Sequence, residues 1–301
     1  MGISLRKISK SYKKVQAVHD ISFAVAPGEL FGLIGPDGAG KTTIFRVLTT
    51  LLLPNKGNAT VAGFDVVKDY KAIRKSVGYM PGRFSLYQDL TVEENLTFFA
   101  TIFGTTIEEN YGLIEDIYVQ IKPFKDRRAG KLSGGMKQKL ALCCALIHKP
   151  KVLFLDEPTT GVDPVSRKEF WEMLKRLQKK NITILVSTPY MDEAALCDRI
   201  ALIQDGEILD IDTPKAIVNK FPKTIYNVKA SNMYKLILAL QKYEHTYSVF
   251  PFGEFVHYTD KRDSFETEDL TSYLSTTDLN DISIAPTQAD IEDAFMELAK
   301  K

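Results

Sequence analysis

A short loop between an apolar run and a helical stretch constrains the fold of this chain more than any other feature. The run Leu30–Ile34 has the composition of a buried strand, and the loop that follows it has the order Gly35-x-x-x-x-Gly40-Lys41-Thr42. This is the spacing of a phosphate-binding loop, in which backbone N–H groups and a helix N-terminus hold phosphate oxygens. Lys41 would neutralise phosphate charge, and the hydroxyl of Thr42 would bind Mg²⁺. The expected nucleotide contacts are Gly35, Pro36, Asp37, Gly38, Ala39, Gly40, Lys41, Thr42 and Thr43.

Strands and helices alternate through the rest of the first two thirds of the chain. Residues 151–156 and 182–187 are continuous apolar runs typical of central parallel strands, and residues 164–179 between them have the period of an amphipathic helix. The alternation predicts an α/β fold with right-handed crossovers. Residues 83–150 show helical periodicity and few strand signals, so we expect an inserted helical subdomain there. Asp205-Gly206 predicts a hairpin turn at the end of the α/β region.

The pattern changes after about residue 220. The sequence there predicts β, α, β, β, α, β and a last helix, which is the order of a ferredoxin-like domain. We therefore expect two domains, an α/β domain over residues 1–220 and a small α+β accessory domain over residues 221–301.

Composition excludes several classes of protein. The 301 residues include Lys+Arg 39 and Asp+Glu 38, which leaves a net charge of +1. Domains that bind nucleic acid by neutralising phosphates usually carry a basic excess, so we expect no nucleic-acid partner. The apolar stretch Leu140–Ile147 is far shorter than the roughly 18 residues that cross a bilayer, and the N-terminus has no signal-peptide core. Three cysteines without Cys-x-x-Cys spacing predict neither a disulfide framework nor a zinc site.

An acidic pair ends the apolar run at 151–156. Asp156 and Glu157 would lie at the carboxyl edge of the sheet, where ligands bind in open α/β folds. On its own such a pair is more often a helix cap or a surface turn, but the phosphate-binding loop favours a functional role. We expect Asp156 to hold Mg²⁺ through water, and Glu157 to orient and deprotonate the attacking water as the catalytic residue.

A serine followed by two glycines opens a further helix. Leu132-Ser133-Gly134-Gly135-Met136-Lys137-Gln138 could be an ordinary capped helix start or a second anion-binding site. Together with the loop and the acidic pair, in this order, it resembles the ATP-binding cassette (ABC) transporter ATPases, whose signature motif is LSGGQ. The resemblance covers roughly residues 1–217. It implies a RecA-like core with an antiparallel β subdomain and the inserted helical subdomain, ATP and Mg²⁺ as ligands, and Ser133, Gly134 and Gly135 as part of the nucleotide site.

The resemblance also implies partners. In this family two ATPase subunits sandwich two ATP molecules, each phosphate-binding loop facing the other subunit's signature, so that one chain holds two half-sites. Whether the second subunit is a copy of this chain or a different one stays open. Tyr12 matches the aromatic residue that stacks on adenine, although a plain surface tyrosine is nearly as good an interpretation. Thr159–Asp163 matches the loop that crosses the dimer interface. The subunits act on a separate transmembrane permease at the cytoplasmic face of the membrane.

Three stretches resemble the exporter branch of the family, which includes multidrug- and antibiotic-resistance ATPases. They are Met136 in the signature, the run Ser187–Ala194, and the ending Asp290–Phe295, for which an amphipathic final helix is the plain alternative. We expect the ATP-hydrolysing subunit of an exporter. A non-transport ABC ATPase and a low-turnover regulatory nucleotide-binding subunit are the alternatives. The transported substrate is chosen by the permease and is not encoded here.

Two positions depart from the family pattern. The family places a Gln that touches Mg²⁺ and the attacking water where this chain has Gly82, and a switch His that contacts the γ-phosphate where it has Pro189. Gln88 lies too far along the chain for easy substitution. Since Glu157 remains, we expect slow hydrolysis rather than none.

Overall fold

The computed structural model describes residues 2–300, and the chain divides into two compact units, one up to Pro214 and one from Lys215. The division lies a few residues before the expected domain boundary and assigns most of helix α8 (Pro214–Asn219) to the second unit.

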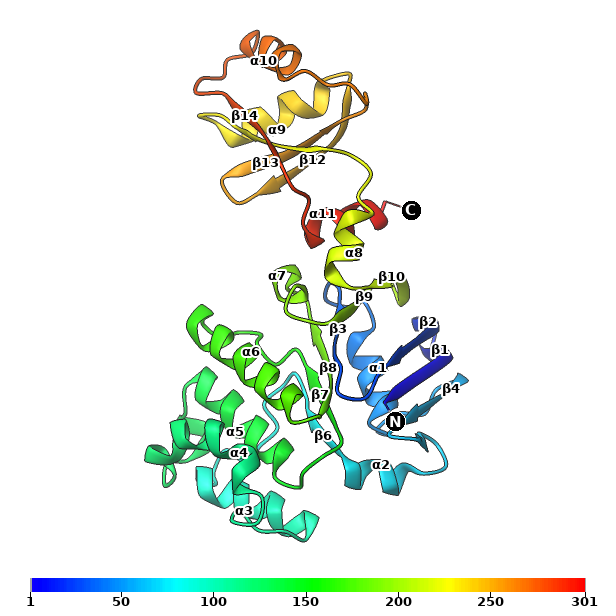
Figure 1. The fold of residues 1–301 in the computed structure, drawn as a ribbon, viewed down its shortest axis with the longest axis vertical. Coiled ribbons are helices and arrows are strands. Elements are labelled where there is room, and N and C mark those ends of the chain that lie inside the picture. Colours follow the sequence, from blue (N-terminus) through cyan, green and yellow to red (C-terminus); the bar gives the residue numbers. More distant parts are fainter. Residues whose placement is uncertain (1, 301) are drawn as a thin grey trace. The chain divides into compact units, whose positions relative to one another are not determined.

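A six-stranded sheet forms the centre of the first unit (Figure 1). Its order is β10-β9-β3-β8-β7-β6. The strands are β3 (Leu30–Ile34), β6 (Val77–Met80), β7 (Val152–Asp156), β8 (Thr183–Thr188), β9 (Arg199–Gln204) and β10 (Glu207–Asp212). All neighbours are parallel except β9 and β10, which form the expected hairpin through Asp205 (φ 50°) and Gly206 (φ 79°). Every residue of β3, β7 and β8 is buried, which explains why the strands are mainly apolar; the polar residues of β7 and β8 lie at the strand ends.

A four-stranded antiparallel sheet lies beside it, in the order β2-β1-β4-β5. Its strands are β1 (Ile3–Tyr12), β2 (Val15–Val25), β4 (Lys56–Val61) and β5 (Phe64–Asp65). Helix α1 (Lys41–Leu48) packs in the core that both sheets share, where Phe45 meets Phe154 edge to face at 6.0 Å. Helix α2 (Tyr70–Ser76) leads into β6. Helix α1 ends at Leu48, and Thr50 beyond it has a positive φ of 63°.

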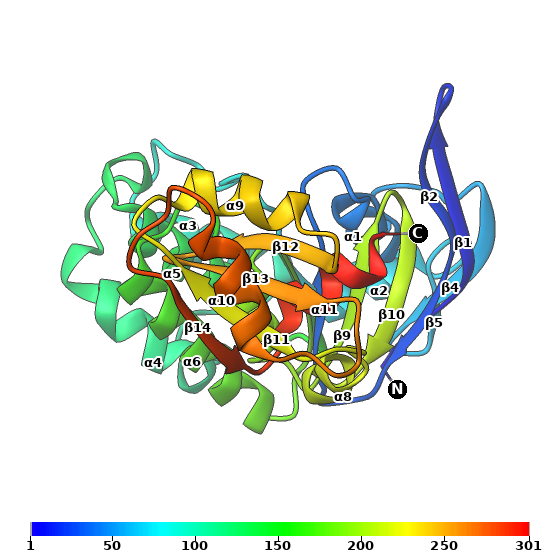
Figure 2. The ribbon, with the colours of Figure 1, turned by 90° about the horizontal axis from the view of Figure 1, so that it is seen from above.

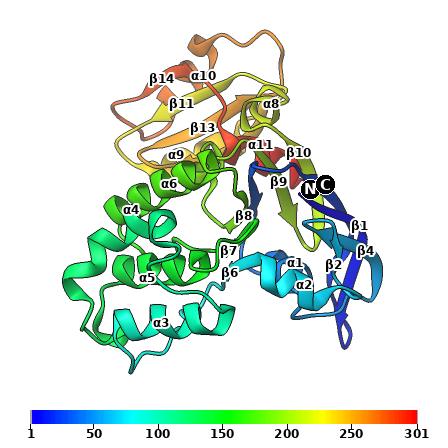
Figure 3. The ribbon, with the colours of Figure 1, turned by 60° about the horizontal axis from the view of Figure 1, so that its bottom comes forward.

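Residues 83–150 are helical, as the sequence predicts, with α3 (Val92–Phe103), α4 (Tyr111–Ile121), α5 (Gly134–Leu146) and two short 3₁₀ turns. Helix α3 begins in a capping box between Thr91 and Glu94. These helices and α6 (Pro164–Lys179) lie on one side of the six-stranded sheet in the view of Figure 3, and α1 lies toward the other. The short α7 (Met191–Ala194) follows β8.

The second unit contains β11 (Ile225–Lys229), α9 (Met233–Lys242), β12 (Thr246–Phe252), β13 (Phe255–Asp260), α10 (Thr267–Ser275), β14 (Ser283–Thr287) and α11 (Ile291–Leu298). Its antiparallel sheet has the order β12-β13-β11-β14, and its own apolar core lies around Val228, Leu236 and Tyr258. This is the α+β arrangement that the order of the elements predicts.

Candidate functional site

The phosphate-binding loop wraps the buried side chain of Lys41. The Nζ of Lys41 donates to the carbonyl oxygens of Gly35 at 2.7 Å and of Pro36 at 2.9 Å. Gly40, the residue before α1, has φ 100°, which glycine adopts without strain, and no side chain caps the helix after it. The first N–H groups of a helix have no partner within the helix, so this end is free to bind an anion.

Two close approaches hold the loop. A Cβ at Gly35 would lie 2.0 Å from the carbonyl oxygen of Ile203 in β9, so only glycine fits there. The hairpin turn after β9 supports the other side, because the N–H of Gly206 donates to the carbonyl of Ala39 at 3.2 Å. Strands β3 and β9 therefore place the loop at the carboxyl edge of the sheet.

The acidic pair lies at the same edge, at the end of β7. Asp156 is buried, and its Oδ1 accepts a hydrogen bond from the Ser187 hydroxyl at 2.7 Å. Glu157 has φ 51°, and its N–H is held by the carbonyl and hydroxyl oxygens of Ser187, both at 3.1 Å. Oε1 of Glu157 lies 3.2 Å from Nζ of Lys41. The structure therefore brings together the lysine expected to bind phosphate and the glutamate expected to be catalytic.

The residues present fit a nucleotide with a divalent cation. The uncapped helix end and the Lys41 ammonium suit phosphate, and Thr42 and Asp156 supply the hard oxygen atoms that Mg²⁺ prefers. Over residues 2–300, no group of three or more His, Cys, Asp and Glu side chains is placed to hold a metal by itself.

Tyr12 lies at the end of the β1–β2 hairpin, which projects beyond the neighbouring strand β4 (Figure 2). Its side chain is 40% exposed, with the Lys10 ammonium 6.0 Å from the ring centre. The second strand of the hairpin touches the loop, because a Cβ at Gly40 would lie 2.5 Å from the carbonyl oxygen of Ala17. An exposed aromatic ring thus lies on an element that borders the phosphate-binding loop.

The segment that resembles the family signature, Ser133–Gly135, does not lie beside the phosphate-binding loop of the same chain. Ser133 caps α5 by accepting from the N–H of Met136 at 3.4 Å. A Cβ at Gly135 would lie 2.7 Å from Oγ of Ser166, and one at Gly134 would lie 3.6 Å from the carbonyl of Gly161. Gly134 therefore lies near the loop that leads into α6 and Gly135 against the first turn of α6, while α5 and α1 lie apart in Figures 1 and 3.

The two departures from the family pattern lie against the acidic pair and beside β8. A Cβ at Gly82 would lie 3.0 Å from the carbonyl oxygen of Asp156 and 3.8 Å from Cβ of Glu157. Pro189 follows directly after β8 and has no side-chain donor. Among the first unit's histidines, His19 contacts Glu207 at 3.1 Å and His148 contacts the Val77 carbonyl at 3.0 Å, so neither stands in for a switch histidine.

Sequence reasoning gave no role to Ser187 or Glu193. Ser187 bonds both members of the acidic pair, and the buried Glu193 accepts from the hydroxyls of Thr159 and Thr188. Ser187 pairs with Asp156 across parallel strands, and aligning the ends of the two apolar runs could have revealed that contact. Glu193 bonds Thr159 from 34 residues away, and no local pattern signals it.

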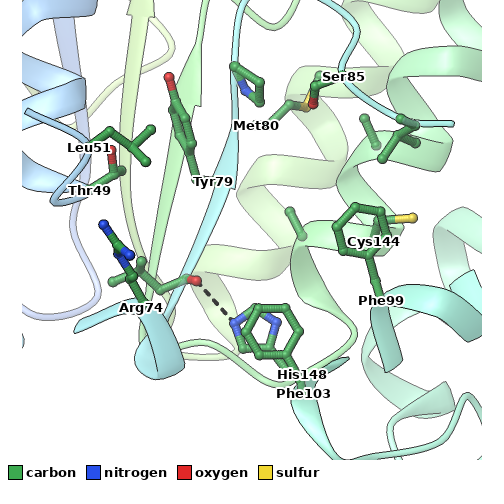
Figure 4. A pocket seen from close by; sticks show the side chains of 15 residues that line it. Thr49, Leu51, Arg74, Tyr79, Met80, Ser85, Phe99, Phe103, Cys144 and His148 are labelled. Atoms are coloured by element: carbon green, nitrogen blue, oxygen red, sulfur yellow. Dashed lines mark hydrogen bonds between the residues drawn. The ribbon is translucent and has the colours of Figure 1, made fainter. Parts of the chain in front are cut away.

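An apolar cavity of about 340 Å³ lies between the helical segment and the α1–α2–β6 region (Figure 4). The ring of His148 stacks on that of Phe103 at 3.7 Å. Burial lowers the pKa of His148, so the ring is neutral at pH 7. The cavity is lined by Thr49, Leu51, Arg74, Val77, Tyr79, Met80, Pro81, Ser85, Leu86, Phe99, Phe103, Ala141, Cys144, Ala145 and His148.

Comparison with known proteins gives a consistent picture. Residues 18–160 match the profile of the ABC transporter family. A stretch of 219 residues, 71% of this chain, is 46% identical to a probable multidrug ABC transporter ATP-binding protein of Escherichia coli (strain K12), and it spans 38% of that relative's length. A Nod factor export ATP-binding protein I of Rhizobium sp. (strain N33) is 40% identical over 223 residues, which are 73% of each chain.

The fold is also found among solved structures. An ATP-binding subunit of an ABC transporter superposes with a TM-score of 0.67 at 26% identity, over 73% of this chain and 93% of that one. Within residues 2–300, no helix combines the length and the apolar composition that a membrane span requires.

Proposed function

The chain belongs to the ABC transporter family, and on that premise we propose that it binds and hydrolyses ATP to power an exporter through a separate transmembrane permease. The observation that carries the proposal is the meeting of Lys41 and Glu157, 3.2 Å apart, at the carboxyl edge of the sheet. A phosphate-binding ammonium and a carboxylate suited to activate water therefore share one site. The names of the two relatives, one for multidrug transport and one for Nod factor export, support the export direction.

ATP would bind with its phosphates against the N-terminus of α1. The backbone from Gly35 to Thr43 would surround them, Lys41 would neutralise their charge, and Tyr12 would stack on the adenine. Thr42 and Asp156 would hold Mg²⁺, with Asp156 acting through water. Bound Mg²⁺ offsets the charge that develops on the phosphates during transfer.

Glu157 would take the proton from the attacking water. Its backbone is fixed by Ser187, which also bonds Asp156, so the two carboxylates keep their relative positions. We expect turnover to be slow, because Gly82 offers no side chain to orient the water and Pro189 offers no donor to the γ-phosphate.

A second ATPase subunit would complete each site. Gly134 lies near Gly161 and Gly135 lies against Ser166 of α6. Ser133, Gly134 and Gly135 would serve the partner's nucleotide. A copy of this chain and a related chain would each satisfy the same half-sites as the second subunit.

The cavity beside β6 is the surface we assign to the permease. Its walls come from the helical segment and from the strand that leads to Gly82, so a permease segment seated there would touch both parts of the chain. The aromatic rings of Phe99 and Phe103 and the neutral His148 suit an apolar side chain. This contact would hold the subunit at the cytoplasmic face of the membrane.

Co-purification tests this function. Expressed with the products of its neighbouring genes, the tagged chain is expected to retain a polytopic membrane protein, and Phe103→Glu is expected to release it. Recovery of ribosomes or of soluble proteins alone would instead support a non-transport ABC ATPase. The missing Gln and His favour a second candidate, a low-turnover regulatory subunit, which predicts nucleotide binding without hydrolysis.

A further inference from the structure

We propose that Glu193 is a positioning residue for ATP hydrolysis, because its carboxylate fastens the loop after Glu157 to the end of β8. The inference rests on the proposed hydrolytic function. The Oε1 atom of Glu193 accepts from the hydroxyl of Thr159 at 2.8 Å, and its Oε2 atom accepts from the hydroxyl of Thr188. One side chain on α7 thus joins two segments that border the site.

Each oxygen atom of the Glu193 side chain has its own hydroxyl partner. The Thr159 hydroxyl donates to Oε1 and the Thr188 hydroxyl donates to Oε2. The Thr188 hydroxyl also accepts from the N–H of Tyr190 at 3.0 Å. Glu193 therefore bonds the loop after Glu157 and the end of β8 at the same time.

The cluster is buried, and the guanidinium group of Arg167 faces it. Glu193 is 2% exposed, and Thr159 and Thr188 are buried with it. The Nε atom of Arg167, from the first turn of α6, lies 3.8 Å from Oε1 of Glu193. Hydrogen bonds in such a place are strong, and an unpaired group left there is costly. The loop 157–160 therefore has one favoured position relative to β8.

Both ends of this connection reach the reacting groups. Thr159 follows Glu157 by two residues, and Glu157 has the left-handed φ of 51° that a glutamate keeps only when its surroundings hold it. The carbonyl of Thr188 accepts from the N–H of Gly35 at 3.3 Å, where the phosphate-binding loop begins. Glu193 thereby sets the position of the catalytic carboxylate relative to that loop without touching the nucleotide.

Pro189 makes the hydrogen bonds of Glu193 to Thr159 and Thr188 more important for the geometry of the site. The residue after Thr188 offers no donor to phosphate, so the segment between β8 and α7 contributes through its position alone. In this chain Thr188 is the one point of that segment that bonds both the phosphate-binding loop and, through Glu193, the loop of Glu157.

The test compares four variants of the full-length chain by steady-state ATPase, nucleotide affinity and thermal unfolding. Glu193→Ala and the milder Thr159→Val are expected to lower kcat about tenfold, the effect of one charged hydrogen bond, with KM for ATP and ATP affinity unchanged. Adding Thr159→Val to Glu193→Ala is expected to lower kcat no further, since both act through one contact. Asp192→Asn is the matched control, because Asp192 is 66% exposed and pairs with the same Arg167 at 3.2 Å; it is expected to keep the wild-type kcat.

Three results would overturn the proposal: wild-type kcat in folded Glu193→Ala or Thr159→Val, an equal loss in Asp192→Asn, or additive losses in the double variant. A purely structural role would lower the melting temperature and leave kcat per folded active site unchanged, and that outcome also overturns it. Wild-type turnover no greater than that of Glu157→Gln would refute the hydrolytic function itself, so the two failures are distinguishable.

Discussion

The Nζ atom of Lys41 lies 3.2 Å from the Oε1 atom of Glu157, although the two residues come from different strand ends and are far apart in sequence. The same ammonium donates to the carbonyls of Gly35 and Pro36. A phosphate that enters the loop would compete with Glu157 for this cation. Nucleotide binding would thereby release the carboxylate that hydrolysis requires.

Replacing Lys41 tests the binding half of this relationship. Lys41→Ala is expected to lower the affinity for ATP at least about tenfold, because a charge-assisted hydrogen bond to phosphate is lost. Titration with a fluorescent ATP analogue measures the change. Lys75→Ala, which removes an exposed lysine of α2, is the control and should bind as the wild type does. Equal affinity in Lys41→Ala would contradict the assigned role.

Restoring a donor at position 189 is expected to accelerate turnover. Pro189→His would supply a side-chain donor beside β8, and donors to developing phosphate charge commonly change rates about tenfold or more. The comparison variant is Gly82→Gln, whose Cβ would lie 3.0 Å from the Asp156 carbonyl oxygen. Gly82→Gln should bind ATP as the wild type does, but its kcat should rise less than that of Pro189→His, because the neighbouring backbone must shift to admit the new side chain. A kcat for Pro189→His at or below the wild-type value would count against the explanation for slow hydrolysis.

The expectations that the structure confirms are those that depend on neighbouring residues in the sequence. The strands Leu30–Ile34 and Val152–Asp156 are buried on both faces, which favours apolar residues at every position before Asp156, and the runs are visible by inspection. The turn at Asp205-Gly206 is equally local, since both residues need positive φ. The position of Asp156 and Glu157 at the carboxyl edge of the sheet followed from the rule that parallel strands end at one edge, but the contact between Glu157 and Lys41 was not predicted.

What the sequence did not predict depends on contacts between distant residues or on a weak helix end. No glycine marks the end of α1 after Leu48, where Thr50 has φ 63°, so the sequence gives no local signal for that end. In the sequence, nothing distinguishes Glu193 from any other acidic residue of a helix. Only the fold brings it to Thr159 and Thr188.

Asn95 offers a test of stability in the helical segment. Its buried side chain accepts from the Tyr87 N–H at 3.1 Å and donates to the carbonyls of Tyr87 and Thr91 at 3.0 and 2.9 Å. Asn95→Ala is expected to lower the free energy of unfolding by about 2–4 kcal/mol, since several buried backbone groups lose their partner. Denaturant unfolding measures it. Asn58→Ala, on the exposed side of β4, should change stability by less than about 0.5 kcal/mol, and a similar loss in both variants would contradict the account.

The three cysteines should be inert in the folded protein. Burial raises the pKa of the Cys143, Cys144 and Cys197 thiols above the ordinary range, which lowers the fraction of reactive thiolate at any given pH. Iodoacetamide at about pH 8 should therefore label none of them in native protein and all of them in denaturant, as mass spectrometry would show. Rapid labelling of the native chain would mean that these thiols are not buried as described.

The central claim is that this chain hydrolyses ATP with Glu157 as the base, and the most direct measurement compares steady-state ATPase rates of wild type and Glu157→Gln. Removing a general base commonly costs about 100-fold or more, so the account predicts a slow wild-type rate that clearly exceeds the variant's, with ATP affinity retained in both. Indistinguishable rates would contradict it.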